Sequence, residues 1–181
     1  QNAEDTETGI PPFIEATGGT ITEDGNFKIH TFTGPGTFQV TRLATESPAP
    51  VYNIVSYVVA AGGGSGGGTG ATTHGGGGGG AGGFREGKNA PVDSYTASPL
   101  NAPAGIPVSV TSYPITVGAG GTTPGSGPVK GGSGSNSVFS TITSTGGGGG
   151  GSLGSPGSPA CRAGASGGSG GGGSSQVAGP G

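Results

Sequence analysis

Apolar residues are clustered along the chain rather than spread evenly through it. They gather mainly between Ile10 and Val59, with smaller groups at Ile106–Val117 and Val138–Ile142. No segment places them at helical spacing over three turns, and proline or glycine interrupts nearly every candidate helix. The pattern predicts a small β core with essentially no α-helix.

The apolar groups divide into short strand-like segments that are separated by turn residues. Glu23–Asn26 carries an Asp-Gly turn and Gly34–Gly36 a second turn. Val51–Ala61 is the longest run rich in Val, Ile and Tyr, which predicts a central strand. Pro107 and Pro114 place their segments at sheet edges or strand starts. The predicted strands are Thr20–Thr22, Phe27–Thr33, Thr37–Leu43, Val51–Ala61, Ile106–Val110, Tyr113–Val117 and Asn136–Thr145.

Two strand-like runs lead directly into blocks of nearly pure glycine. Glycine makes up 15 of the 22 residues in Gly62–Gly83 and 17 of the 36 residues in Gly146–Gly181. Such blocks are either flexible tethers or extended polyproline-II-type helices, in which the missing Cβ permits close lateral packing. Fixing a backbone costs about 1–2 kcal/mol per residue, whereas one hydrogen bond returns about 0.5–1.5 kcal/mol. The near balance favours a bundle anchored by strands over an isolated rod.

We therefore predict an all-β fold: a small antiparallel β-sandwich or jelly-roll-like domain that carries polyglycine-II segments. The expected organisation has three parts. Residues 1–9 form an acidic N-terminal arm or connector. Residues 10–145 form the glycine-rich β domain, with 62–83 as an internal polyglycine block. Residues 146–181 form a glycine-rich C-terminal segment, either polyglycine-II-like or partly disordered.

Charge and composition argue against several classes of function. The net charge of −3 gives no electrostatic footprint for nucleic acid. No apolar stretch approaches the roughly 20 residues that span a bilayer, so we expect no membrane insertion. The single cysteine, Cys161, cannot form an internal disulfide. The chain contains no methionine, which indicates a processed product or a fragment.

Residues able to carry catalysis are sparse. Gly82–Asn89 approaches the spacing of a phosphate-binding loop, but Asn89 stands where the magnesium-binding Ser or Thr is needed, and Ala90-Pro91 disfavours the required helix. His30 and His74 are the two histidines, and neither has a metal ligand at a suitable spacing. No base is placed to activate a serine. We expect no enzyme activity, no cofactor and no metal.

The better candidates for function are aromatic and polar residues beside loops, because loops on a rigid frame carry recognition. The alternative for each of them is simple solvation or turn formation. The receptor-binding candidates are His74, Phe84, Arg85, Tyr95 and Lys130, with Leu153 and Arg162 as further interruptions of the glycine.

Five glycine-containing or strand-like motifs follow one another along the chain: Gly18–Phe32, Tyr57–Gly64, Gly79–Gly87, Ile115–Gly121 and Ser137–Phe139. In this order they resemble the glycine-rich domain of bacteriophage tail and tail-fibre proteins. The similarity covers most of Gly18–Gly151, and the sequence beyond Gly146 is similar in texture to the polyglycine-II tail-tip adhesins of T-even-like phages.

This resemblance implies a non-enzymatic tail-fibre or virion-surface protein that contributes to host-cell attachment. Its expected location is the virion surface or extracellular space. Expected partners are other virion or fibre subunits, in a possible homotrimer, and a bacterial surface receptor, either protein or glycan. The alternative is a structural fibre or capsid-decoration subunit without receptor contact. Ice or mineral binding by a flat glycine bundle is a third hypothesis.

Overall fold

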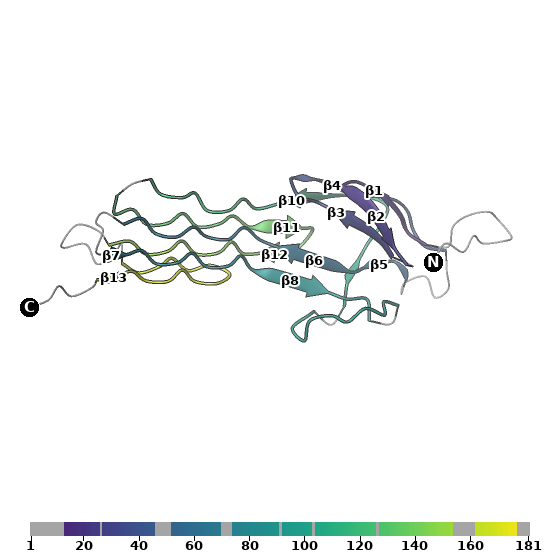
Figure 1. The fold of residues 1–181 in the computed structure, drawn as a ribbon. Helices are drawn as coiled ribbons and strands as arrows, with labels where there is room; N and C mark the ends of the chain where they lie inside the picture. Colours follow the sequence, from purple (N-terminus) through teal and green to yellow (C-terminus); the bar gives the residue numbers. More distant parts are fainter. Residues whose placement is uncertain are drawn as a thin grey trace, which may run out of the picture. The chain divides into compact units, whose positions relative to one another are not determined.

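The computed structural model describes residues 13–25, 27–45, 52–69, 74–90, 92–102, 104–125, 127–153 and 162–176 (Figure 1). Over these residues the predicted all-β fold is confirmed, with antiparallel strand pairs and helical backbone at Tyr52 alone. The predicted acidic arm, residues 1–9, and Cys161 lie outside the described residues.

The strands are short and follow the apolar groups of the sequence. Thirteen lie in the described part of the chain. They are β1 (Glu15–Thr17), β2 (Thr20–Asp24), β3 (Phe27–Thr31), β4 (Gly36–Arg42), β5 (Ile54–Val55), β6 (Tyr57–Ala60), β7 (His74–Gly75), β8 (Phe84–Gly87), β9 (Ile106–Pro107), β10 (Ser112–Thr116), β11 (Ser137–Phe139), β12 (Ile142–Ser144) and β13 (Ser175–Gln176).

These strands belong to two compact units, each assembled from segments far apart in sequence. Unit 1 comprises Gln1–Val58, Arg85–Thr116 and Phe139–Thr141. Unit 2 comprises Val59–Phe84, Val117–Val138 and Ile142–Gly181. Both glycine blocks therefore fall in unit 2.

Two predicted strands are each divided in the structure. Val51–Ala61 is interrupted at Ser56, which separates β5 from β6. The Ser56 hydroxyl accepts a hydrogen bond from the Asn89 N–H at 2.8 Å and donates to the Asp93 carboxylate, so Ser56 serves the loop after β8. Asn136–Thr145 becomes the pair β11 and β12, because Ser140 adopts φ 54° and turns the chain.

Unit 1 has an aromatic core centred on β4. β4 lies between β1 and β10, with Ala16 opposite Val40 and Tyr113 opposite Phe38. Phe38 and Val40 are buried. Edge-to-face contacts, which aromatic pairs prefer, join His30 to Phe38 at 5.0 Å and Phe38 to Phe139 at 6.0 Å between ring centroids. Phe38 therefore joins His30 and Phe139 in one aromatic cluster.

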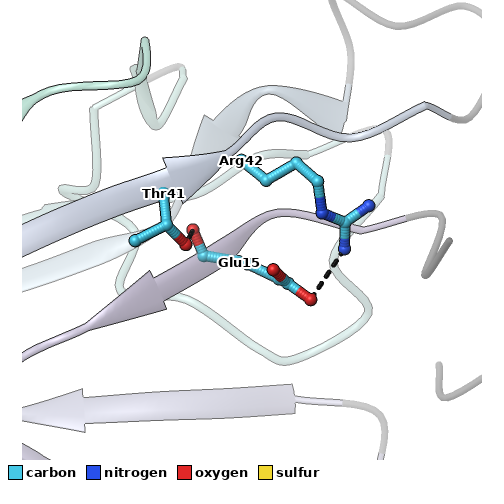
Figure 2. Close-up of polar contacts among 3 residues, drawn as sticks. All are labelled: Glu15, Thr41 and Arg42. Carbon is cyan, nitrogen blue, oxygen red and sulfur yellow. Dashed lines mark hydrogen bonds and ion pairs between the residues drawn. The ribbon is translucent and has the colours of Figure 1, made fainter.

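An ion pair joins the edge strand β1 to β4 in the same sheet. Glu15 and Arg42 are cross-strand partners on β1 and β4, and their side chains form an ion pair at 2.8 Å (Figure 2). The hydroxyl of Thr41 donates to the carbonyl of Glu15 at 3.2 Å. The hydrogen bond from Arg42 lowers the pKa of the Glu15 carboxyl. Because solvent reaches both side chains and screens their attraction, the ion pair adds little to stability.

Unit 2 is built from extended glycine segments that run side by side (Figure 1). In the segment 61–68, the N–H groups of residues 61, 64 and 67 donate to one neighbour, 77–83. Those of residues 62, 65 and 68 donate to another neighbour, 129–135, and the six distances span 2.8–3.1 Å. A period of three residues with all bonds directed outward is the geometry of polyproline-II-type helices. The other segments are 118–122, 145–152, 162–168 and 169–174.

The segment 145–152, here called the central segment, is saturated with hydrogen bonds. Gly146–Gly151 are all buried. Every carbonyl of these six residues accepts a backbone hydrogen bond, at 2.7–2.9 Å, and every N–H donates one, at 2.8–3.2 Å. In chain order, the six N–H groups donate to Asn136 Oδ1, Gly62 O, Ser169 O, Ser133 Oγ, Ser65 O and Gly172 O.

Two side chains complete this pattern where no backbone carbonyl does so. Ser133 and Asn136 are three residues apart, and so are Gly149 and Gly146, which they serve. The spacing of Ser133 and Asn136 therefore follows the three-residue period of the helix. Their side chains take the place of backbone acceptors.

The first prediction tests the need for glycine inside the bundle. A Cβ on Gly150 would lie 2.0 Å from the carbonyl oxygen of Gly77, whereas a Cβ on exposed Gly78 would meet nothing within 4 Å. Gly150→Ala should lower the free energy of unfolding by about 1–3 kcal/mol or more, because backbone must move. Gly78→Ala should leave it unchanged or raise it by about 0.4–1 kcal/mol. Denaturant unfolding of both variants measures this, and equal stabilities would contradict the packing.

The second prediction concerns side-chain satisfaction of the central segment. Asn136→Ala removes the acceptor of the Gly146 N–H and should cost about 1–3 kcal/mol, because that donor is buried. Asn136→Asp retains an oxygen at the same position and should recover most of the loss. Hydrogen exchange at Gly146 follows the effect, and unchanged protection in the alanine variant would argue against the bond.

Candidate functional site

Several hydrogen bonds join the described residues at one end of the glycine segments of unit 2. The Gly68 N–H donates to the carbonyl of Val129 at 2.8 Å, and the Ser152 hydroxyl donates to the carbonyl of Gly68 at 2.7 Å. Ser174 N–H donates to the carbonyl of Arg162 at 2.9 Å. The described residues of this surface, which we call the bundle end, are Thr69, His74, Gly75, Thr122–Gly125, Gly127–Lys130, Arg162 and Ser174–Gln176.

Two residues of the bundle end accept hydrogen bonds from the segment 61–68. The Ser65 hydroxyl donates to the carbonyl of Thr122 at 2.6 Å, and the Gly68 N–H donates to the carbonyl of Val129. Gly127 has φ 121°, a conformation that favours glycine. Val129 is 51% exposed beside half-buried Lys130. An apolar and a cationic residue are thus held on a fixed backbone.

The structure separates the other predicted receptor-binding residues. His74 lies in β7, opposite Gln176 of β13, at the bundle end. Phe84 is 58% exposed and belongs to unit 2, whereas the adjacent Arg85, also exposed, belongs to unit 1. Tyr95 belongs to unit 1 as well. His74, Phe84 and Lys130 therefore belong to unit 2, while Arg85 and Tyr95 belong to unit 1.

Tyr95 makes contacts within its own loop and with β3. Its ring lies edge-on to Phe27 at 6.3 Å, and the Lys88 ammonium sits 5.0 Å from the ring centroid. Lys88 also donates to the Tyr95 carbonyl. Burial raises the pKa of the Tyr95 phenol, opposed by a hydrogen bond with Ser56. These contacts give Tyr95 a role in ordering the loop. They also occupy Lys88, the residue that completes the phosphate-loop-like spacing.

Sequence analysis missed the most exposed large apolar residue on this loop. Leu100 is 94% exposed. It sits in a turn in which Asn101 N–H donates to the carbonyl of Ser98 at 3.0 Å, and Glu86 accepts from the Ser98 N–H at 2.9 Å. The sequence pattern that could have identified it is a single leucine between Pro99 and Asn101, in an otherwise polar stretch.

Leu153, by contrast, belongs to the interior. It was a candidate because it interrupts glycine beside a predicted loop, but it is buried at 8% exposure directly after the central segment. Its apolar side chain therefore packs rather than projecting for recognition.

The described residues show little concentration of reactive groups. No three of their His, Cys, Asp or Glu side chains lie close enough together to hold a metal ion. In the same part of the chain, no helix is long and apolar enough to span a bilayer. What the arrangement offers is exposed apolar and polar side chains on ordered turns, which suits recognition by contact.

A bundle of extended glycine segments flanked by short strands defines a glycine-rich domain. The chain belongs to the glycine-rich domain family, whose model matches residues 33–181. The match covers both glycine blocks and begins just after the Gly18–Phe32 motif. The comparisons with curated proteins and with solved structures gave no match. The family description names neither a virus nor a tail fibre.

The third prediction uses the raised pKa of Tyr95. Because the folded protein holds the phenol proton more tightly than the unfolded chain, its contribution to stability is present below the usual tyrosine pKa of about 10. That contribution is lost as the pH rises through the folded pKa. Tyr95→Phe retains the ring and should show a smaller loss of stability at alkaline pH. Denaturant unfolding followed by circular dichroism at neutral and alkaline pH tests this, and identical pH slopes in both proteins would contradict it.

Proposed function

We propose that this chain is a non-enzymatic bacteriophage tail-fibre or virion-surface protein that contributes to host-cell attachment through loops on a β and polyglycine scaffold. The observation that carries the proposal is the saturated central segment, Gly146–Gly151. It makes unit 2 an ordered frame without reactive side chains, so that contact with a partner falls to the connections between segments.

The composition of the bundle end supports this proposal. Val129 and Lys130 combine an exposed apolar side chain with a half-buried cationic one, and His74 lies in the strand pair β7 and β13. Preorganised side chains lose less conformational entropy on binding than mobile ones do. The proposed partner is a bacterial surface receptor, either protein or glycan, and the proposed location is the virion surface. Arg85 and Phe84 remain further candidates because both are exposed.

The alternative is a structural fibre or capsid-decoration subunit, and a different observation favours it. All five residues of β2 are exposed, and among the described residues β2 pairs with β3 alone, so no described strand occupies its other edge. Open strand edges gain hydrogen bonds by pairing with another chain. A homotrimer or an attachment to other fibre subunits would then use this edge without any receptor contact.

The fourth prediction tests attachment through the bundle end. Val129→Ser and Lys130→Ala should each weaken binding of the labelled protein to susceptible intact bacteria by about tenfold, the effect expected for an important contact. Val110→Ser is the matched control, since Val110 is 57% exposed but belongs to unit 1. Cell-binding isotherms on a panel of bacterial strains provide the measurement.

Light scattering coupled to size-exclusion chromatography separates the two proposals. A monomer that binds cells and loses binding in the Val129 and Lys130 variants agrees with attachment. An obligate oligomer that binds no strain would favour the structural subunit. Equal losses in Val129→Ser and Val110→Ser would refute a specific role of the bundle end.

A further inference from the structure

A groove in unit 1 lies apart in sequence from the residues of the proposed attachment site. It is formed by the turn between β1 and β2 and by the loop between β3 and β4. Its volume is about 320 Å³, at the small end of the roughly 300–1,000 Å³ typical of ligand sites. That size fits one or two small rings.

One wall of the groove is the ring of Phe32, which is held by glycine backbones. A Cβ on Gly19 or Gly36 would approach ring atoms of Phe32 at 3.1 Å, and a Cβ on Gly18 would approach them at 3.4 Å. Gly18 and Gly19 have φ of 107° and 66°, so both turn and ring position depend on glycine. The half-buried ring is therefore fixed in place while it lines the groove.

Four threonines line the groove together with Phe32. Thr20 and Thr31 are direct cross-strand partners on β2 and β3, so their side chains share one face. Thr33 and Thr37 come from the opposite loop and the start of β4. None of the four hydroxyls bonds to another described residue, and each can both donate and accept a hydrogen bond.

The groove also carries no charged side chain, since no Asp, Glu, Lys or Arg lines it among the described residues. A phosphate, an acidic sugar or a cation would lack a charged partner there. The combination of one aromatic face with several neutral hydroxyls matches a molecule that has both C–H faces and many hydroxyls. Its weakly positive C–H groups suit the negative face of the ring.

We propose that this groove binds a neutral saccharide, with one sugar ring against Phe32 and its hydroxyls bonded to Thr20, Thr31, Thr33 and Thr37. A proline-rich peptide is the main competing occupant, because such peptides dock in aromatic-lined grooves. Phe32 is the one aromatic residue among those that line the groove. This favours the saccharide, since a proline-rich peptide docks against several aromatic side chains. The site is independent of the proposed host attachment, and either can fail without the other.

The fifth prediction tests the groove with defined probes. The full-length, isotope-labelled protein is titrated with glucose, galactose, mannose, N-acetylglucosamine and their disaccharides. At least one should cause saturable shifts confined to the amides of Gly18–Thr20 and Thr31–Thr37. Thr20→Val together with Thr31→Val should weaken that binding by about tenfold, because two hydrogen bonds are lost.

Thr22→Val is the matched control, since Thr22 is an exposed threonine on the same strand that does not line the groove. Phe32→Leu should also weaken binding, and the threonine variants decide the matter if that variant does not fold. The proposal is overturned if no neutral saccharide binds, or if the double variant binds as Thr22→Val does. Binding of sialic acid or a proline-rich decapeptide at the same amides in place of neutral sugars would likewise overturn it.

Discussion

Hydrogen bonding between backbones is the constraint on which unit 2 depends. Glycine has no side chain to bury, so the central segment gains almost nothing from hydrophobic burial. Each N–H left unpaired in its interior would cost about 1–3 kcal/mol, and ordering each residue costs about 1–2 kcal/mol. Gly146–Gly151 are therefore ordered only because five other segments, with Ser133 and Asn136, satisfy every donor and acceptor. Removing any one neighbour exposes unpaired groups on the segment that remains.

The two units solve the problem of folding with different chemistry. Unit 1 packs rings such as Phe38, Tyr113 and Phe139 around β4, in the ordinary way of a small β domain. The interior of unit 2 is mostly backbone, since a Cβ at most inward-facing glycines would overlap a neighbouring carbonyl. The buried side chains Ser152 and Leu153 come at the end of the central segment and directly after it. Side chains that can recognise a partner are consequently found on connections and outer faces. The proposed attachment at Val129 and Lys130 follows from this distribution.

Local features of the sequence were sufficient to predict part of this fold. The Asp24-Gly25 turn predicted the β2–β3 hairpin, in which Gly25 has φ 55°. The absence of helical periodicity predicted the all-β class, and the free-energy balance of glycine predicted a bundle. The pairing of segments was beyond prediction, because one glycine run resembles another and partners lie far apart in the chain. Of the candidate residues, Tyr95 and Leu153 illustrate the limit, since their burial depends on contacts that no local pattern specifies.

The repeat of the hydrogen bonds in unit 2 limits how such a chain can change in length. Each segment repeats its hydrogen bonds to a given neighbour every three residues, which is one helical turn. Adding or removing one or two residues would therefore rotate all later N–H donors away from their acceptors. A change by one whole turn, made in every segment of the bundle together, would preserve the pairing and move the connections outward or inward along the helix axes. Glycine-rich domains of this type can therefore differ in length by insertions of three residues in each segment, while the pattern of hydrogen bonds between segments stays the same.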